Sequence, residues 1–94
     1  MGKMTKRRDK LEVIYDILRT ISINHNSIRF TPLLRHSNLS SQSFAGYINE
    51  LLQKGFIREI QDKKGKKFIT LTDKGFEYLS KYRLVLGFID EFDL

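Results

Sequence analysis

The feature that most constrains the fold of this chain is the order of local signals between residues 31 and 75. Thr31-Pro32 is typical of a helix start, and Asn38-Leu39-Ser40 is typical of a turn between helices. An apolar pattern of helical period covers residues 40–54, and two β-rich runs within residues 56–71 flank a lysine-rich turn. Helix, turn, helix and hairpin in this order predict a small, mainly helical α+β domain.

The remaining segments complete this domain. Asp9 and Glu12 form an acidic version of a capping box before a helix that we expect over residues 10–23. Residues 28–30 alternate and are short, which predicts a small strand and hence a sheet of two or three strands. Thr31 is the expected cap of a short helix over residues 32–37.

We divide the chain into three parts on this basis. Residues 1–9 form a basic arm, residues 10–75 form the helical domain with its hairpin, and residues 72–94 form a last helix with an acidic tail. Thr72-Asp73 is the expected start of that helix.

Charge points to an anionic partner. The 94 residues include 17 Lys and Arg against 11 Asp and Glu, a net charge of +6. This balance favours nucleic acid first and an anionic membrane surface second. No segment approaches the length of a membrane span or has the apolar run of a signal peptide, so we expect a soluble, cytoplasmic protein without membrane contacts.

The sequence contains no pattern typical of catalysis or of a cofactor. There is no cysteine, which excludes disulfides and zinc–thiolate sites. His25 and His36 lack metal-ligand spacing and are better explained as surface residues. No glycine-rich phosphate loop and no serine nucleophile motif occurs. We predict a protein that is not an enzyme, with no metal and no cofactor.

One face of the expected helix 40–54 carries uncharged amides. Gln42, Gly46, Asn49 and Gln53 recur at spacings of four, three and four, opposite the apolar face. Gln and Asn offer the paired donor and acceptor that match the major-groove edge of adenine, which points to base readout. The alternative is a polar surface without that role. At the helix start, Ser40 and Ser41 are candidate phosphate contacts and Ser43 is a candidate base contact.

The hairpin turn concentrates positive charge. Its lysines repel one another in the free protein, and a phosphate backbone would relieve that repulsion. The alternative is a charged edge that only discourages aggregation. The predicted phosphate contacts are Lys63, Lys64, Lys66 and Lys67, with the arm residues Lys6, Arg7 and Arg8, and with Arg29 and Arg35 as weaker candidates.

The last helix is more apolar than one small domain can cover. We therefore predict a homodimer through this helix, and a two-fold dimer would also present two probe helices to two half-sites. The alternative is that the segment folds back onto the first helix, with Gly87 allowing a bend. The predicted interface residues are Leu79, Tyr82, Val85, Leu86, Phe88, Ile89 and Phe92.

Several motifs together resemble a known family. They are Thr31-Pro32-Leu33-Leu34, Ser37-Asn38-Leu39-Ser40, Tyr47-Ile48, Leu51-Leu52, Gly55-Phe56-Ile57 and Leu71-Thr72-Asp73-Lys74-Gly75. Over residues 10–82 the chain resembles the small archaeal winged-helix DNA-binding proteins, above all the crenarchaeal ten-kilodalton chromatin-associated type. The resemblance implies a winged helix-turn-helix dimerised by an antiparallel pair of C-terminal helices. The chain departs from the pattern in a short last helix, interrupted by Gly87, and in its acidic tail.

Three functional hypotheses follow. The first is a dimeric, nucleoid-associated archaeal transcriptional regulator that binds double-stranded DNA with some sequence preference. The second is an architectural chromatin protein of the same fold with little base readout. The third is a protein-interaction module whose hairpin lysines face an acidic partner.

Overall fold

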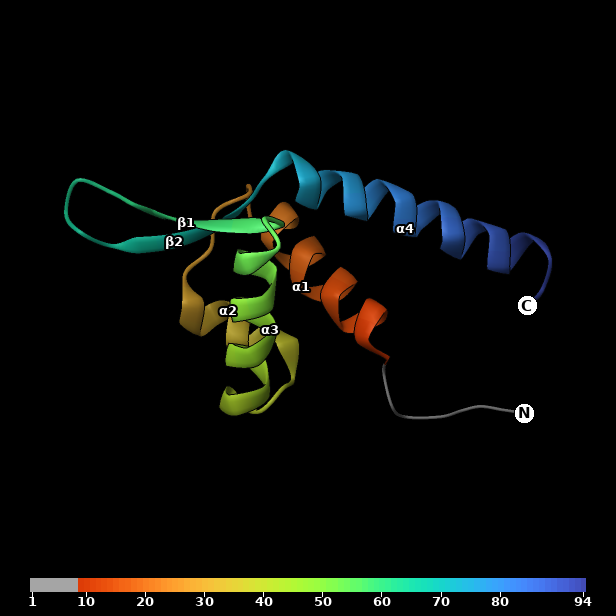
Figure 1. Cartoon of the computed structure of the whole chain (residues 1–94), viewed down its shortest axis with the longest axis horizontal. Coiled ribbons are helices and arrows are strands. Elements are labelled where there is room, and N and C mark those ends of the chain that lie inside the picture. The colour runs from red at the N-terminus through yellow and green to blue at the C-terminus, as the bar shows by residue number, and fades with distance from the viewer. Residues whose placement is uncertain (1–8) are drawn as a thin grey trace.

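The computed structural model describes residues 9–94. The elements in chain order are α1 (Lys10–Ile23), α2 (Phe30–Ser37), α3 (Ser41–Gln53), β1 (Ile57–Gln61), β2 (Lys67–Leu71) and α4 (Asp73–Glu91). The molecule measures 50 × 27 × 22 Å, with the β1–β2 hairpin projecting at one end and the second half of α4 at the other (Figure 1). The predicted α+β class and the winged helix-turn-helix architecture are confirmed.

Of the four helices in residues 9–94, three begin at a side-chain cap. Asp9 Oδ1 accepts from the Glu12 amide at 2.8 Å before α1. Ser40 Oγ accepts from the Ser43 amide at 3.1 Å before α3, and Thr72 Oγ1 caps α4 in the same way. Each cap satisfies one amide that the helix leaves unpaired and contributes about 1 kcal/mol.

Helix α2 starts earlier than predicted. It begins at Phe30 with Arg29 as an extended cap residue that makes no side-chain bond, so the prediction of Thr31 as the cap is wrong. The Phe30 ring packs edge-on against the Phe44 ring, with their centroids 5.0 Å apart. The periodicity of the sequence does not reveal this tertiary contact. Pro32 costs no helical bond, because the first one runs from the Leu33 amide to the Arg29 carbonyl.

The sheet is a two-stranded antiparallel hairpin. Ile57 lies opposite Leu71 at its base and Gln61 lies opposite Lys67 near its tip. The expected third strand is reduced to a bridge in which Ile28 exchanges two backbone hydrogen bonds with Ile69, at 3.2 and 2.7 Å. The strand cannot extend further because the chain enters α2 two residues later.

The core lies where α1 meets the other helices and the base of the hairpin. Ile17, Leu18 and Ile21 of α1 are at most 1% exposed, so α1 is the central helix of the domain. The other fully enclosed large side chains are Leu33, Phe44, Leu51, Ile57 and Leu79.

Helix α4 is continuous through Gly87. The predicted interruption at this glycine is therefore wrong. Its first half packs on α1, where the Tyr15 and Tyr82 rings stack at 4.8 Å. Leu79 is 2% exposed in this contact, so it belongs to the core and not to the predicted dimer surface. From Leu84 onward every residue is exposed, which rules out the fold-back alternative for this half. Among the described helices, none has the length and apolarity needed to cross a membrane.

Candidate nucleic-acid interface

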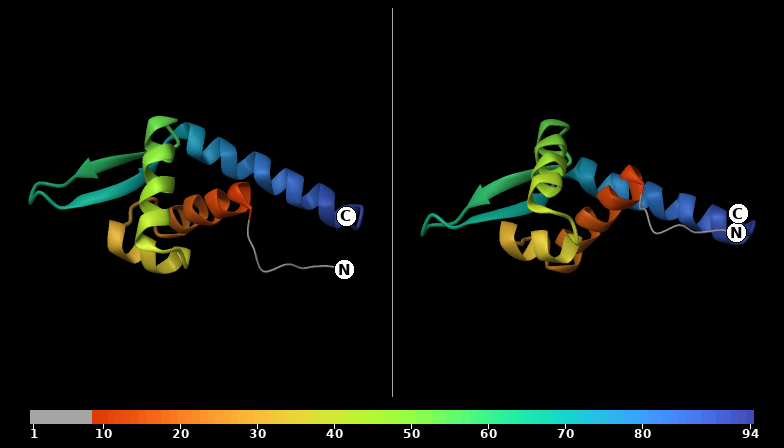
Figure 2. Two further views of the ribbon diagram at one scale, coloured as in Figure 1. Left: turned by 60° about the horizontal axis from the view of Figure 1, so that its bottom comes forward. Right: turned by 90° about the horizontal axis from the view of Figure 1, so that it is seen from below.

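The core holds α3 by one face and leaves the other in solvent. Phe44, Ile48 and Leu51 are at most 6% exposed and fix the helix against the domain. In two rotated views α3 stands across the base of the hairpin, on the side away from the tail of α4 (Figure 2). Its outer face is therefore free to approach a large partner.

The predicted amide stripe lies on that outer face. Gln42, Gly46, Asn49 and Gln53 are all exposed. A Cβ added at Gly46 would meet nothing within 4 Å, so packing inside the domain does not require glycine there. A glycine in an exposed helix costs stability, but it lowers the helix surface where a partner could approach closely.

The serines at the start of α3 occupy different positions. Ser40 Oγ already accepts from the Ser43 amide, so only its O–H remains to donate to a phosphate. Ser41 and Ser43 are exposed. The turn before them forms as predicted, with Asn38 in the left-handed conformation at φ 58°. Exposed amides at a helix start attract anions, which suits this end to a phosphate.

The hairpin tip is built around Asp62. One of its carboxylate oxygens accepts from the amides of Lys64 and Lys66, both at 2.9 Å. Gly65 completes the turn at φ 84°. This backbone network leaves the side chains of Lys63, Lys64, Lys66 and Lys67 exposed, and none of them forms an ion pair with another residue of the described range.

A groove of about 670 Å³ runs between the hairpin and the start of α2. It brings Arg29 together with Lys64, Lys66 and Lys67, while Glu59 supplies one acidic group. Arg35 is exposed in the last turn of α2, near the turn into α3. The predicted arm residues Lys6, Arg7 and Arg8 lie outside the described residues.

An ion-pair cluster on the flank of α3 was not predicted. Glu50 Oε2 lies 2.8 Å from both Lys10 Nζ and Lys54 Nζ. The hydrogen bonds from Lys10 and Lys54 lower the pKa of Glu50 to about 2, so its charge is fixed and paired. The i,i+4 spacing of Glu50 and Lys54 could have revealed half of this cluster. Its other half joins residues 40 positions apart and has no local signal.

Residues 9–94 contain no group of His, Asp or Glu side chains that could hold a metal ion. The exposed groups of this region are amides, hydroxyls and ammonium ions. Such groups can bind bases and phosphates.

Comparison with known proteins identifies the fold family. A family model described as winged helix-turn-helix matches residues 7–88. The chain belongs to the winged helix-turn-helix family. In this family's terms the β1–β2 hairpin is the wing, and α3 is the second helix of the helix-turn-helix.

Several solved structures share the fold. Sso10a-2, a DNA-binding protein from Sulfolobus solfataricus, superposes with a TM-score of 0.73 at 16% identity, over 90% of this chain and 85% of that one. A winged-helix DNA-binding protein from STIV gives 0.67 at 22% identity, over 77% of this chain and 84% of that one. The PcaV transcriptional regulator from Streptomyces coelicolor gives a TM-score of 0.72 at 14% identity, over 84% of this chain and 59% of that one. The predicted resemblance to archaeal winged-helix proteins is confirmed.

One curated relative is an uncharacterized protein of Methanocaldococcus jannaschii, 32% identical over 83 residues. The match covers 88% of this chain and 36% of that protein, so the chain spans about a third of the relative's length.

Proposed function

We propose that this winged helix-turn-helix protein binds double-stranded DNA, with α3 in the major groove and the wing along the adjacent backbone. The observation that carries the proposal is that two elements expose different kinds of polar group. Uncharged amides occupy the outer face of α3. The wing tip carries ammonium groups that form no ion pair within residues 9–94. Amides suit base edges, and ammonium groups suit phosphates.

On this proposal the base contacts come from Gln42, Asn49 and Gln53, with Ser43 at the edge of the stripe. Gly46 lets the helix backbone approach the bases. Ser40 and Ser41 donate to a phosphate at the helix start, while Arg29 and the wing lysines follow the backbone. Glu50 flanks the stripe, but its negative charge is balanced by ion pairs with Lys10 and Lys54.

We also propose that the protein acts as a homodimeric transcriptional regulator. The second half of α4 exposes large apolar side chains, among them Val85 at 50%, Phe88 at 56% and Phe92 at 58%. A second copy that covered them would place two recognition helices on one duplex, as half-site recognition requires. PcaV, described as a transcriptional regulator, shares the fold and supports this proposal.

A salt-titrated binding assay tests the DNA proposal. Affinity for a random duplex should fall steeply as salt rises from about 50 to 200 mM, and Lys64→Ala should reduce the slope of log K against log salt by about 0.9. Arg83→Ala is the matched control, since it removes one positive charge from exposed α4 and should leave the slope unchanged. Equal slopes for the wild type and Lys64→Ala would contradict wing contact with phosphate.

Selection of bound sequences from a pool of random duplexes distinguishes a sequence-specific regulator from an architectural protein. A regulator should enrich a motif, and Gln42→Ala or Asn49→Ala should relax the preference at one base position each by about 1–3 kcal/mol. Enrichment of no motif, with full affinity in both variants, would favour an architectural protein that reads charge and shape.

A further inference from the structure

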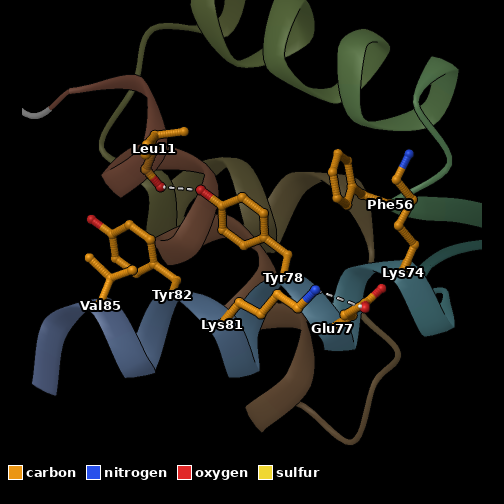
Figure 3. A pocket seen from close by; sticks show the side chains of 8 residues that line it. All are labelled: Leu11, Phe56, Lys74, Glu77, Tyr78, Lys81, Tyr82 and Val85. Carbon is orange, nitrogen blue, oxygen red and sulfur yellow. Dashed lines mark hydrogen bonds and ion pairs between the residues drawn. The ribbon is translucent and has the colours of Figure 1, made fainter. Parts of the chain in front are cut away.

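A groove lies where the first half of α4 passes the start of α1 (Figure 3). Its volume is about 320 Å³, at the lower end of the range for small-molecule sites. Its apolar walls come from three parts of the chain: Leu11 of α1, Phe56 between α3 and β1, and Tyr78, Tyr82 and Val85 of α4. This Tyr78 groove is separate from the surface that we propose to contact DNA.

The floor of the Tyr78 groove is preformed. Figure 3 shows the rings of Phe56, Tyr78 and Tyr82 in a row. The Tyr78 ring stands edge-on to Phe56, with their centroids 5.6 Å apart, and stacks with Tyr82 at 5.9 Å. The Tyr78 hydroxyl donates to the Leu11 carbonyl at 2.7 Å, and burial is the main cause that raises its pKa to about 12. The phenol therefore stays neutral near pH 7 and places no negative charge in the floor.

The walls of the groove leave apolar surface in solvent. Leu11 is 55% exposed and Val85 is 50% exposed, while Phe56, Tyr78 and Tyr82 are half-buried. Aromatic rings attract a further ring at a centroid separation of about 4.5–7 Å. A flat aromatic molecule therefore suits this surface better than a branched or polar one.

Charge at the rim favours an anion. The ammonium groups of Lys74 and Lys81 stand against the carboxylate of Glu77, a net charge of +1 among these three groups. Lys81 pairs with Glu77 at 3.2 Å, but both side chains are largely exposed, so water competes with the pair. Lys74 lies over the Phe56 ring at 4.7 Å and donates to the Lys54 carbonyl, which leaves it further hydrogens to donate. One carboxylate on an occupant would balance the rim.

Two residues of the groove are also bonded to the last turn of α3. Lys74 Nζ lies 2.7 Å from the carbonyl oxygen of Lys54, the residue that caps the end of α3. The Phe56 amide donates to the Leu51 carbonyl at 2.9 Å. An occupant that contacts Lys74 and Phe56 should therefore perturb this end of α3 as well.

We propose that the Tyr78 groove binds a small aromatic carboxylate. The ring of the ligand lies against Tyr78 and Phe56, and its carboxylate pairs with Lys81 in place of Glu77. Lys74 adds a second positive charge at the rim. This site goes beyond the proposed DNA binding and does not depend on it.

Binding of 2-naphthoate to the full chain, without DNA, tests the proposal. In a chemical-shift titration the Kd should be about 0.1–1 mM, as expected for a ligand of this size. Nuclear Overhauser contacts should join its ring protons to Phe56, Tyr78 and Val85, and the amides of residues 51–56 should shift. 2-Naphthalenemethanol has the same rings without the charge, so its Kd should be about five-fold higher. Equal Kd values for the two probes, or contacts spread along residues 88–94, would overturn the proposal.

Substitutions at the rim should move the Kd of 2-naphthoate in opposite directions. Lys81→Met keeps the apolar stem and should raise the Kd about five-fold, whereas Glu77→Gln frees Lys81 and should lower it about two-fold. Neither should change the Kd of 2-naphthalenemethanol. Arg19→Met is the matched control, because Arg19 is exposed on α1 and does not line the groove. An unchanged Kd in Lys81→Met, or an equal rise in Arg19→Met, would overturn the proposal.

A second copy of the chain is the other candidate occupant, and Phe88→Ala distinguishes it. Phe88 lies in the proposed dimer surface and does not line the groove. 2-Naphthoate should bind the wild type and Phe88→Ala with the same Kd at every protein concentration. Binding that occurs only in Phe88→Ala, or that weakens as the wild-type concentration rises, would show that a partner fills the groove and would overturn the proposal. Because no DNA is present in these experiments, their failure would leave the proposed function intact.

Discussion

Lys10 Nζ lies 2.8 Å from Glu50 Oε2, which links the first residue of α1 to the flank of α3. Lys54 reaches the same oxygen from one turn further along α3. The hydrogen bond between Lys10 and Glu50 raises the pKa of Lys10 and lowers that of Glu50 to about 2. The cluster links α3 to α1 and pairs the carboxylate of Glu50, which flanks the amide stripe.

Glu50→Gln should lower Tm at neutral pH by a few degrees at most, because the pair is exposed. The folded pKa of Glu50 is depressed, so its contribution is full above pH 4.5 and is lost as pH falls towards about 2. The Tm difference between wild type and Glu50→Gln should therefore vanish near pH 2. The Lys10→Gln, Glu50→Gln double variant should be about as stable as Glu50→Gln alone, because Glu50→Gln already removes the ion pairs with both Lys10 and Lys54. A Tm difference that persists near pH 2 would contradict this account.

Leu79→Ala should destabilise the domain by about 3 kcal/mol, since it opens a cavity at a site that is 2% exposed. In urea denaturation the loss should not depend on protein concentration, as expected for a core residue. Phe88→Ala provides the contrast: it should leave the protomer folded and raise the dimer Kd. A concentration-dependent loss in Leu79→Ala would place Leu79 at an interface instead.

The glycines Gly46 and Gly75 should respond oppositely to alanine. Gly46→Ala should stabilise the domain by about 0.5 kcal/mol, because the added methyl group meets open space and favours the helix. Gly75→Ala should cost about 2 kcal/mol, since its Cβ would lie 2.3 Å from the Phe56 carbonyl oxygen. Thermal unfolding measures both. If α3 docks on DNA, Gly46→Ala should also weaken DNA binding despite its greater stability.

Asn26 fixes the loop after α1 to the base of the wing. Its Oδ1 accepts from the Leu71 amide at 2.7 Å, and its backbone is left-handed at φ 57°. Asn26→Gly keeps that backbone conformation and removes the acceptor, so it should cost about 1–2 kcal/mol and speed hydrogen exchange at the Leu71 amide. His25→Gly is the matched control, with φ 61° and an exposed side chain, and should leave that amide protected.

Local chemistry explains why much of the fold could be predicted. Three helices are capped by a side-chain oxygen that accepts from the amide three residues further on, at Asp9, Ser40 and Thr72. Gly65 likewise sets its turn through its own left-handed backbone. These signals are contained in short segments. The exposed amide stripe follows equally directly from helical spacing and the buried position of Phe44.

Contacts between distant residues explain what could not be predicted. The Phe30–Phe44 ring contact extends α2 beyond its apparent start, and Asn26 reaches a residue 45 positions away. Leu79 has the same helical pattern as its exposed neighbours, and only its contact with the core distinguishes it. Gly87 stays helical because a glycine in a long helix costs only about 1 kcal/mol.

The central claim is that α3 and the wing form one DNA-facing surface. An amide chemical-shift titration of the full chain with a short duplex, at low salt, tests it most directly. We predict that the largest perturbations fall on residues 41–53 and 62–67, with little change in residues 84–94. Perturbations concentrated in α4 or around the Tyr78 groove, with the wing amides unmoved, would contradict the claim.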